Sequence, residues 1–203
     1  MKQEEKNQQS RERILRAAVA EFGTKGYDGA SLNVLLSENG ISKGLLYHYF
    51  QNKDQLYLSC VETCFDELTE VLSTLPIVGD AKKGIQAYFE VRARFFHEHP
   101  GLERIFFDAL LQPPAHLEAE LRAAMAGFDR VNRSLFKDTL GSVRLREGLS
   151  DEDALNYFTL LQSALHLQYH SVVKRTPGMA GTYEDRARGL MELLLYGLAG
   201  REE

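Results

Sequence analysis

The side chains best suited to chemistry in this sequence lie in one short run, residues 43–48. If that run is helical, its outward positions are Lys43, Gly44, Leu45, Tyr47 and His48. They offer a cation, a phenol, an imidazole and a glycine that lets another molecule approach the backbone. Phosphates and base edges are partners that such groups bind well. The run therefore predicts contact with a nucleic acid.

Two short helices joined by a tight turn would position this run. Leucines at helical spacing form the inner face of the first helix: Leu32, Leu35 and Leu36. Ser31 and Ser42 are suited to cap the two helices, and Gly40 supplies the backbone freedom that a tight turn requires. Leu46 and Phe50 can anchor the second helix, which is too short to be stable in isolation. This arrangement predicts a helix-turn-helix whose second helix enters the major groove.

A longer helix is expected before this pair. Its apolar residues fall at i, i+3, i+4 and i+8, which is one face of a helix: Ile14, Ala17, Ala18 and Phe22. We expect Ser10 to cap the start of this helix and Gly26 to end it.

The rest of the chain also shows helical spacing, and strand-like alternation is scarce. Residues 52–55 resemble a capping box that opens a helix running to about Pro76. Five further helical segments are expected, over 80–98, 102–111, 115–140, 150–174 and 182–198, separated by Pro and Gly pairs or a single Gly. The expected fold is all-α, with about nine helices.

Composition limits the class of protein. The 203 residues are 44% hydrophobic and 26% charged, as in an ordinary soluble globular protein. The net charge is −5, divided into +1 over the first 60 residues and −6 over the remainder. A mild imbalance of this kind is compatible with a nucleic-acid contact at one end. The polar start and the lack of a long apolar run predict a cytoplasmic protein without a membrane contact.

The N-terminal third resembles the DNA-binding domain of the TetR family. The resemblance covers about residues 10–57 and rests on three ordered strings: RILRAAVAEFGTKGY over 13–27, GISKGLLYHYF over 40–50 and NKDQL over 52–56. It implies a DNA-binding domain over 1–57 and a ligand-binding and dimerisation domain over 58–203. The DNA contacts it implies are Ser31, Ser42, Lys43, Gly44, Leu45, Tyr47, His48 and Lys53. The resemblance assigns phosphate contacts to Tyr47 and Lys53, and gives Ser31 a capping role.

The resemblance also implies a homodimer that binds an operator and responds to a small molecule. Aromatic residues with interleaved polar groups suggest a pocket for an aromatic or amphipathic organic effector: Phe65, Tyr88, Arg92, Phe96, Phe107, Phe128, Asn132, Tyr157, Gln162 and His166. Plain core packing is the alternative for each of them. The last two helices are expected to pair across a two-fold axis through Leu161, Leu165, Leu190, Leu194, Gly197 and Leu198, although a leucine stripe by itself demands only burial.

The expected function is a DNA-binding transcription regulator, most simply a repressor released from an inverted-repeat operator by an organic effector. One alternative is a helical protein-interaction adaptor that keeps the fold without binding DNA. An enzyme is another, but no acid–base pair or phosphate loop has a recognisable spacing. Cys60 and Cys64 are one turn apart, as are His166 and His170. We interpret the cysteines as buried apolar residues rather than a redox switch, and expect no metal or other cofactor because the histidines lack a third ligand.

Overall fold

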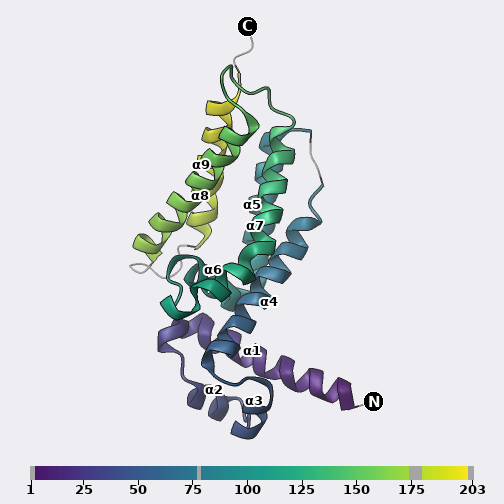
Figure 1. Ribbon diagram of the computed structural model, residues 1–203, viewed down its shortest axis with the longest axis vertical. Helices are drawn as coiled ribbons and strands as arrows, with labels where there is room; N and C mark the ends of the chain where they lie inside the picture. The colour runs from purple at the N-terminus through teal and green to yellow at the C-terminus, as the bar shows by residue number, and fades with distance from the viewer. Residues whose placement is uncertain (1–2, 77–78, 174–179, 201–203) are drawn as a thin grey trace. The chain divides into compact units, whose positions relative to one another are not determined.

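The computed structural model describes residues 3–76, 79–173 and 180–200, and the side chains of residues 4–76, 79–165 and 185–200. Within these residues the fold consists of helices, with one isolated antiparallel bridge between Leu145 and Ala199. The α-helices are α1 (Gln3–Gly29), α2 (Leu32–Glu38), α3 (Lys43–Tyr49), α4 (Lys53–Ser73), α5 (Ala81–Glu98), α6 (Pro100–Leu111), α7 (Glu118–Leu140), α8 (Asp151–Val173) and α9 (Ala180–Leu198). A short 3-10 helix, η1 (Ala115–Leu117), precedes α7 (Figure 1). The prediction of an all-α fold with about nine helices is confirmed.

The chain divides into two compact units. The first unit is Met1–Asp66 together with Glu98–Ala126, and the second unit is Glu67–His97 together with Gly127–Glu203. Helices α6 and η1 thus pack with α1–α3, although they lie far from them in sequence. Among the described residues, no helix is both long enough and apolar enough to cross a lipid bilayer.

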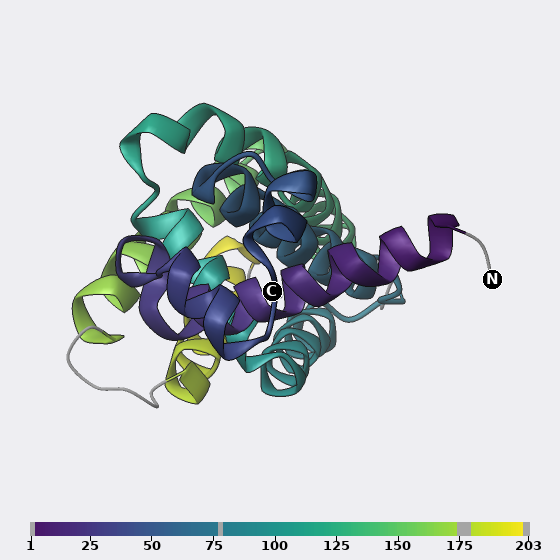
Figure 2. The same cartoon turned by 90° about the horizontal axis from the view of Figure 1, so that it is seen from below.

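Helix α1 differs from its predicted bounds at both ends. The prediction that Ser10 caps its start is wrong, because the helix is already formed at Gln3. Residues 4–9 are exposed, and these turns extend beyond the rest of the first unit (Figures 1 and 2). Gly26 has φ 71° and ψ 177°, a backbone conformation that favours glycine. The predicted stop is therefore a kink, after which the helix continues to Gly29.

The core of the first unit forms around α1 and α6. The predicted inner face of α1 is confirmed, since Ile14, Ala18 and Phe22 are almost fully buried. The two helices cross where each has a glycine: a Cβ atom built on Gly23 would lie 2.5 Å from the carbonyl oxygen of Gly101. Only glycines permit the two backbones to approach this closely.

The second unit contains α5, the larger part of α7, α8 and α9. Helices α8 and α9 lie side by side (Figure 1). The predicted start of α8 is confirmed, because the Asp153 N–H donates to Ser150 Oγ over 3.1 Å and the Ser150 N–H donates to Asp153 Oδ2 over 2.9 Å. This reciprocal pair satisfies two backbone donors that the first turn leaves open.

Candidate nucleic-acid interface and internal cavity

Helices α2 and α3 form the helix-turn-helix that the sequence predicts. The turn between them contains Gly40 at φ 59°, which favours glycine at that position. Leu35 and Leu46 are each 1% exposed and Phe50 is 2% exposed. Both helices are thus anchored in the core through their apolar sides. Because α3 is only seven residues long, this anchoring supplies the stability that its own hydrogen bonds cannot.

Side chains from inside and outside the motif hold the turn. Arg13 on α1 donates from Nη2 to the carbonyl oxygens of Asn39 and Gly40, over 2.6 and 3.3 Å. These contacts place a cation near the C-terminal end of α2, where it is favourable. Ser42 Oγ accepts a hydrogen bond from the Leu45 N–H over 3.2 Å, which confirms the predicted cap of α3. The arginine contact spans 26 residues and was not evident from the local pattern.

Ser31 does not cap α2 through its side chain, so the predicted capping role is wrong. It stands at the N-cap position but makes no side-chain cap hydrogen bond. Its backbone N–H instead donates to Glu21 Oε1 over 2.8 Å. Burial by itself raises the pKa of Glu21, but the Ser31 N–H and the Lys25 ammonium together hold that pKa below its ordinary 4.5. A carboxylate from α1 thus anchors the start of α2.

The outward side of α3 presents the predicted groups together. Lys43, Gly44 and His48 are exposed, Tyr47 is 46% exposed and Leu45 is half-buried. The Lys43 ammonium lies 5.9 Å from the centre of the Tyr47 ring. A Cβ atom on Gly44 would meet nothing within 4 Å. This side therefore offers a cation, a phenol, an imidazole and an open stretch of backbone.

Lys53 stands at the start of α4 and contacts other parts of the first unit. Its Nζ donates to the Ala30 carbonyl oxygen over 2.8 Å and lies 4.7 Å from the centre of the Tyr27 ring. The predicted capping box is present in part: the Gln55 N–H donates to Asn52 Oδ1 over 2.8 Å. Lys53 is half-buried, and its ammonium is held by the Ala30 carbonyl oxygen and the Tyr27 ring.

A polar cluster next to Lys53 joins three elements. The Tyr27 hydroxyl of α1 donates to Asp54 Oδ1 of α4, and His116 Nε2 of η1 lies 3.3 Å from both the Tyr27 oxygen and Asp54 Oδ2. The Tyr27 hydrogen bond, with smaller contributions from His116 and Lys53, lowers the pKa of Asp54 against the effect of burial. Burial and the Asp54 carboxylate raise the pKa of Tyr27 to about 12. Tyr27 therefore stays protonated and Asp54 ionised at neutral pH.

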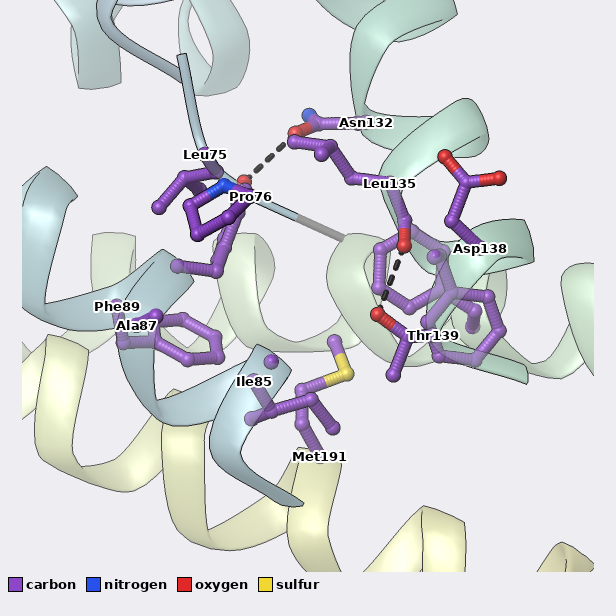
Figure 3. Close-up of a pocket in the computed structure, with 14 residues that line it drawn as sticks. Leu75, Pro76, Ile85, Ala87, Phe89, Asn132, Leu135, Asp138, Thr139 and Met191 are labelled. Atoms are coloured by element: carbon purple, nitrogen blue, oxygen red, sulfur yellow. Dashed lines mark hydrogen bonds between the residues drawn. The ribbon is translucent and has the colours of Figure 1, made fainter. Parts of the chain in front are cut away.

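The second unit contains a cavity with aromatic walls (Figure 3). Its empty volume is about 630 Å³, including solvent at its mouth. The rings of Tyr88, Phe89, Phe136 and Phe158 line it, with Asn132 and Asp138 among its polar residues. Phe136 and Phe158 stack with ring centres 3.9 Å apart. Mostly apolar walls with a few polar groups are typical of small-molecule sites.

A chain of hydrogen bonds leads from this cavity to a buried arginine. The Tyr88 hydroxyl donates to Asn132 Oδ1 over 2.7 Å and accepts from Arg92 Nη1 over 3.2 Å. Arg92 is only 2% exposed, and its guanidinium lies 5.6 and 6.0 Å from the ring centres of Tyr88 and Phe96. The structure thus brings together four of the predicted ligand residues, Tyr88, Arg92, Phe96 and Asn132, of which Tyr88 and Asn132 line the cavity.

The other predicted ligand residues lie elsewhere. Phe65 and Phe107 belong to the core of the first unit, where Phe65 stacks on Phe106 with ring centres 5.0 Å apart. Phe128 is buried in the second unit without lining the cavity. On α8, Tyr157 is 46% exposed and Gln162 is half-buried, while the His166 side chain lies outside the described residues.

The predicted dimer residues differ in exposure. Leu165 and Leu198 are buried within one chain, and Leu161, Leu190 and Leu194 are half-buried. Gly197 is exposed, and a Cβ on it would meet nothing within 4 Å. The exposed apolar surface of α8 and α9 instead comes from large residues outside the predicted set: Tyr157, Leu160, Leu193 and Tyr196, of which Leu160 and Leu193 are each 66% exposed. We call these four residues the α8–α9 face.

The cysteine and histidine pairs carry no assigned chemistry. Cys60 and Cys64 are buried, and burial raises the pKa of the Cys60 thiol, which suppresses the reactive thiolate. The side chains of His166 and His170 lie outside the described residues. Among the side chains that are described, no group of three metal-binding residues comes together.

Comparison with known families matches both parts of the chain. The family described as bacterial regulatory proteins, tetR family, matches residues 14–60. The family described as tetracyclin repressor-like, C-terminal domain, matches residues 79–195. The second match alone covers more than half of the chain.

Individual relatives agree with this assignment. The chain is 28% identical over 159 residues to the uncharacterized HTH-type transcriptional regulator YxaF of Bacillus subtilis, a match covering 77% of this chain and 81% of that protein. It is 34% identical over 62 residues to IcaR of Staphylococcus epidermidis, a negative transcriptional regulator of the biofilm operon icaADBC. That match covers 30% of this chain and 34% of IcaR.

Solved structures share the fold. FadR from Bacillus subtilis, in complex with stearoyl-CoA, superimposes with a TM-score of 0.65 at 16% identity and covers 92% of this chain and 98% of its own. PfmR from Thermus thermophilus gives a TM-score of 0.63 at 21% identity, covering 94% and 100%. With both parts of the chain matched and the helix-turn-helix in place, the protein belongs to the TetR family of transcription regulators.

Proposed function

We propose that this regulator is a repressor that binds an inverted-repeat operator through α3 and leaves it when a small organic effector binds. The observation that carries this proposal is the outward side of α3, where Lys43, Gly44, Tyr47 and His48 are exposed while Leu46 is buried. A recognition helix requires this division between a buried anchor and an exposed reading side. Chromosomal DNA as the partner implies action in the cytoplasm.

The proposed DNA contacts have different tasks. Lys53 and Tyr47 bind phosphates and position the protein, since phosphate contacts carry affinity without sequence information. Lys43 and His48 are exposed on α3 and Leu45 is half-buried beside them; these three residues meet base edges, which supply specificity. Ser42 caps α3, and Gly44 allows close approach of the DNA backbone. Within the proposed division, these residues belong to a DNA-binding domain over 1–57, and 58–203 serves ligand binding and dimerisation.

Dimerisation is proposed through the α8–α9 face. An inverted repeat is two-fold symmetric, so the protein that reads both halves should be a two-fold dimer. The large apolar side chains of this face are exposed in one chain, which is unfavourable unless another surface covers them. Regulators of this family bind DNA and small-molecule effectors, typically as dimers.

The effector site is proposed in the cavity of the second unit. Its apolar walls and the Tyr88–Asn132 pair fit a compact organic molecule with one polar group. FadR, which shares the fold, has been solved with stearoyl-CoA, and this supports a role for the fold in holding an organic effector. An effector that binds better to a conformation with misplaced α3 helices would release the protein by shifting the population.

The test is fluorescence anisotropy with DNA from the region upstream of the gene, measured across a salt series. Wild type should bind this DNA more tightly than a scrambled duplex and lose affinity as salt rises. Tyr47→Ala should weaken binding, and Tyr47→Phe, which keeps the ring, should lie between the two. Lys83→Ala, at an exposed lysine of α5 in the second unit, changes a residue outside α3 and should bind like wild type.

Two outcomes would contradict the proposal. If wild type fails to bind any duplex at low salt, the adaptor interpretation replaces DNA binding. If wild type binds but Tyr47→Ala is unchanged, α3 does not contact DNA in the proposed way.

A further inference from the structure

One side chain outside the proposed DNA-binding domain reaches the residues around Lys53. His116 lies in η1, between α6 and α7, yet its Nε2 is within 3.3 Å of the Tyr27 oxygen and of Asp54 Oδ2. Its side chain is 57% exposed, so core packing does not explain its position. The contact spans 89 residues of sequence. It joins the segment proposed for regulation to two elements that border the DNA-binding surface.

The donors and acceptors in this cluster indicate a role for His116. Tyr27 has a single hydroxyl proton, which it donates to Asp54 Oδ1. Its oxygen can then only accept, and the ionised Asp54 carboxylate has no proton to donate. A hydrogen bond from His116 to either oxygen therefore requires a proton on its Nε2, which both the neutral Nε2–H tautomer and the charged form carry. His116 is thus the donor that completes the cluster.

The position of Tyr27 in turn sets the position of Lys53. The Lys53 ammonium lies over the Tyr27 ring, 4.7 Å from its centre, and donates to the Ala30 carbonyl oxygen. Tyr57 packs edge-on against the same ring with centres 5.0 Å apart. The ring is therefore held by Tyr57 along one edge and by Asp54 and His116 at its hydroxyl. Losing the hydroxyl contacts would free the ring to turn and the ammonium to move.

We propose that His116 is a positioning residue for DNA binding: through Asp54 and Tyr27 it holds the Lys53 ammonium in the place where it meets a DNA phosphate. We call this set the His116–Lys53 relay. It rests on the proposed phosphate contact of Lys53. The relay lies within the first unit, which contains η1 as well as α1 and the start of α4.

A double-mutant cycle in the full-length protein tests the relay. Binding of wild type, His116→Ala, Lys53→Ala and the double variant is measured by anisotropy on upstream and scrambled duplexes, from about 50 to 200 mM salt. His116→Ala should weaken binding to both duplexes about two- to fivefold, as expected for a half-exposed charged hydrogen bond. In the Lys53→Ala background, removing His116 should change affinity by much less, because the residue it positions is gone.

Two further variants separate positioning from other effects. His116→Gln keeps a side-chain N–H of similar reach and should restore much of the lost affinity. His97→Ala, at an exposed histidine of α5 in the second unit, should bind like wild type. Thermal melts by circular dichroism show whether each variant is folded.

The outcomes distinguish the relay from the proposed function. If Lys53→Ala weakens binding and reduces the salt slope by about one but His116→Ala has no effect, the relay is wrong and the phosphate contact stands. If His116→Ala lowers DNA affinity equally in the wild-type and Lys53→Ala backgrounds, the relay is also wrong, because His116 then acts independently of Lys53. If Lys53→Ala binds like wild type, the phosphate contact is wrong and the relay falls with it.

Discussion

The crossing of α1 and α6 makes a specific prediction for Gly23→Ala. A Cβ at this position would lie 2.5 Å from the carbonyl oxygen, 2.7 Å from Cα and 2.9 Å from the carbonyl carbon of Gly101. All three are backbone atoms of α6 and cannot rotate away as a side chain can. Moving from 2.5 Å to an ordinary contact of 3.4 Å requires the helices to separate by about 0.9 Å.

The expected magnitude follows from two opposing terms. Forcing an extra methyl into a close-packed contact costs about 1–3 kcal/mol, and separation of α6 would also loosen the buried Leu102 and Phe106 beside the crossing. Replacing glycine by alanine inside a helix contributes about 1 kcal/mol in the opposite direction. The two terms leave a net loss of up to about 2 kcal/mol for Gly23→Ala. For a chain of this size a loss of that size lowers Tm by up to about 8 °C.

Gly127→Ala is the matched control, because it makes the same chemical change in the interior of α7. A Cβ there would meet only Arg130 Nη2, at 3.9 Å. The helical preference of alanine should then raise Tm by about 2–4 °C. Both variants are compared with wild type by calorimetry at one protein concentration, since the midpoint would depend on concentration if the protein forms the proposed dimer. A rise in Tm for Gly23→Ala would refute the argument that backbone contact decides this site.

Five further variants test other parts of the structure. Leu193→Lys should shift sedimentation equilibrium from dimer towards monomer, and an unchanged mass would place the interface outside the α8–α9 face. Leu46→Ala should lower the free energy of unfolding in urea by about 2–5 kcal/mol. Leu45→Ala should lower it by less than about 1 kcal/mol but should weaken DNA binding. Similar losses of stability for the two variants would contradict the assigned buried and outward sides of α3. Phe136→Ala should cost about 3–5 kcal/mol, and a much smaller loss would mean that its stacked ring is not tightly packed. Glu21 has a pKa below its ordinary 4.5, so it stabilises the fold above about pH 4.5 and loses this effect as the pH falls through its folded pKa. Glu21→Gln should accordingly show a shallower loss of stability in acid by circular dichroism, and an unchanged profile would refute that role.

Local features of the sequence were enough to predict the helices and most of the helix-turn-helix. The turn at Gly40, the Ser42 cap and the buried Leu46 each depend on residues within a few positions of one another. Such short-range rules of spacing and capping can be read directly from the chain. The same rules failed at Ser31, because the group that satisfies the start of α2 is Glu21, ten residues away on another helix.

Helical periodicity was not enough to predict which residues line the cavity or which remain exposed on α8 and α9. A helical pattern shows that an aromatic residue is buried, but not which neighbouring helix covers it. Phe65 and Tyr88 look alike in the sequence, yet one packs in the first unit and the other lines the cavity of the second. On α9 the predicted stripe included Leu198, which is buried within the chain, while Leu193 is exposed. Helices α8 and α9 each have more than one apolar side. Only the packing of the helices shows which of these sides stays exposed to solvent.

Local patterns in the sequence were therefore enough to predict the boundaries of most helices to within a few residues, the helix-turn-helix and the family. The Gly23–Gly101 crossing, the anchoring of α2 by Glu21 and the meeting of His116 with Tyr27 and Asp54 could be seen only in the folded chain. The two groups differ in the distance along the chain over which each interaction acts. Capping and amphipathic spacing are satisfied within one or two turns, whereas these contacts join residues that only the packing of separate helices brings together.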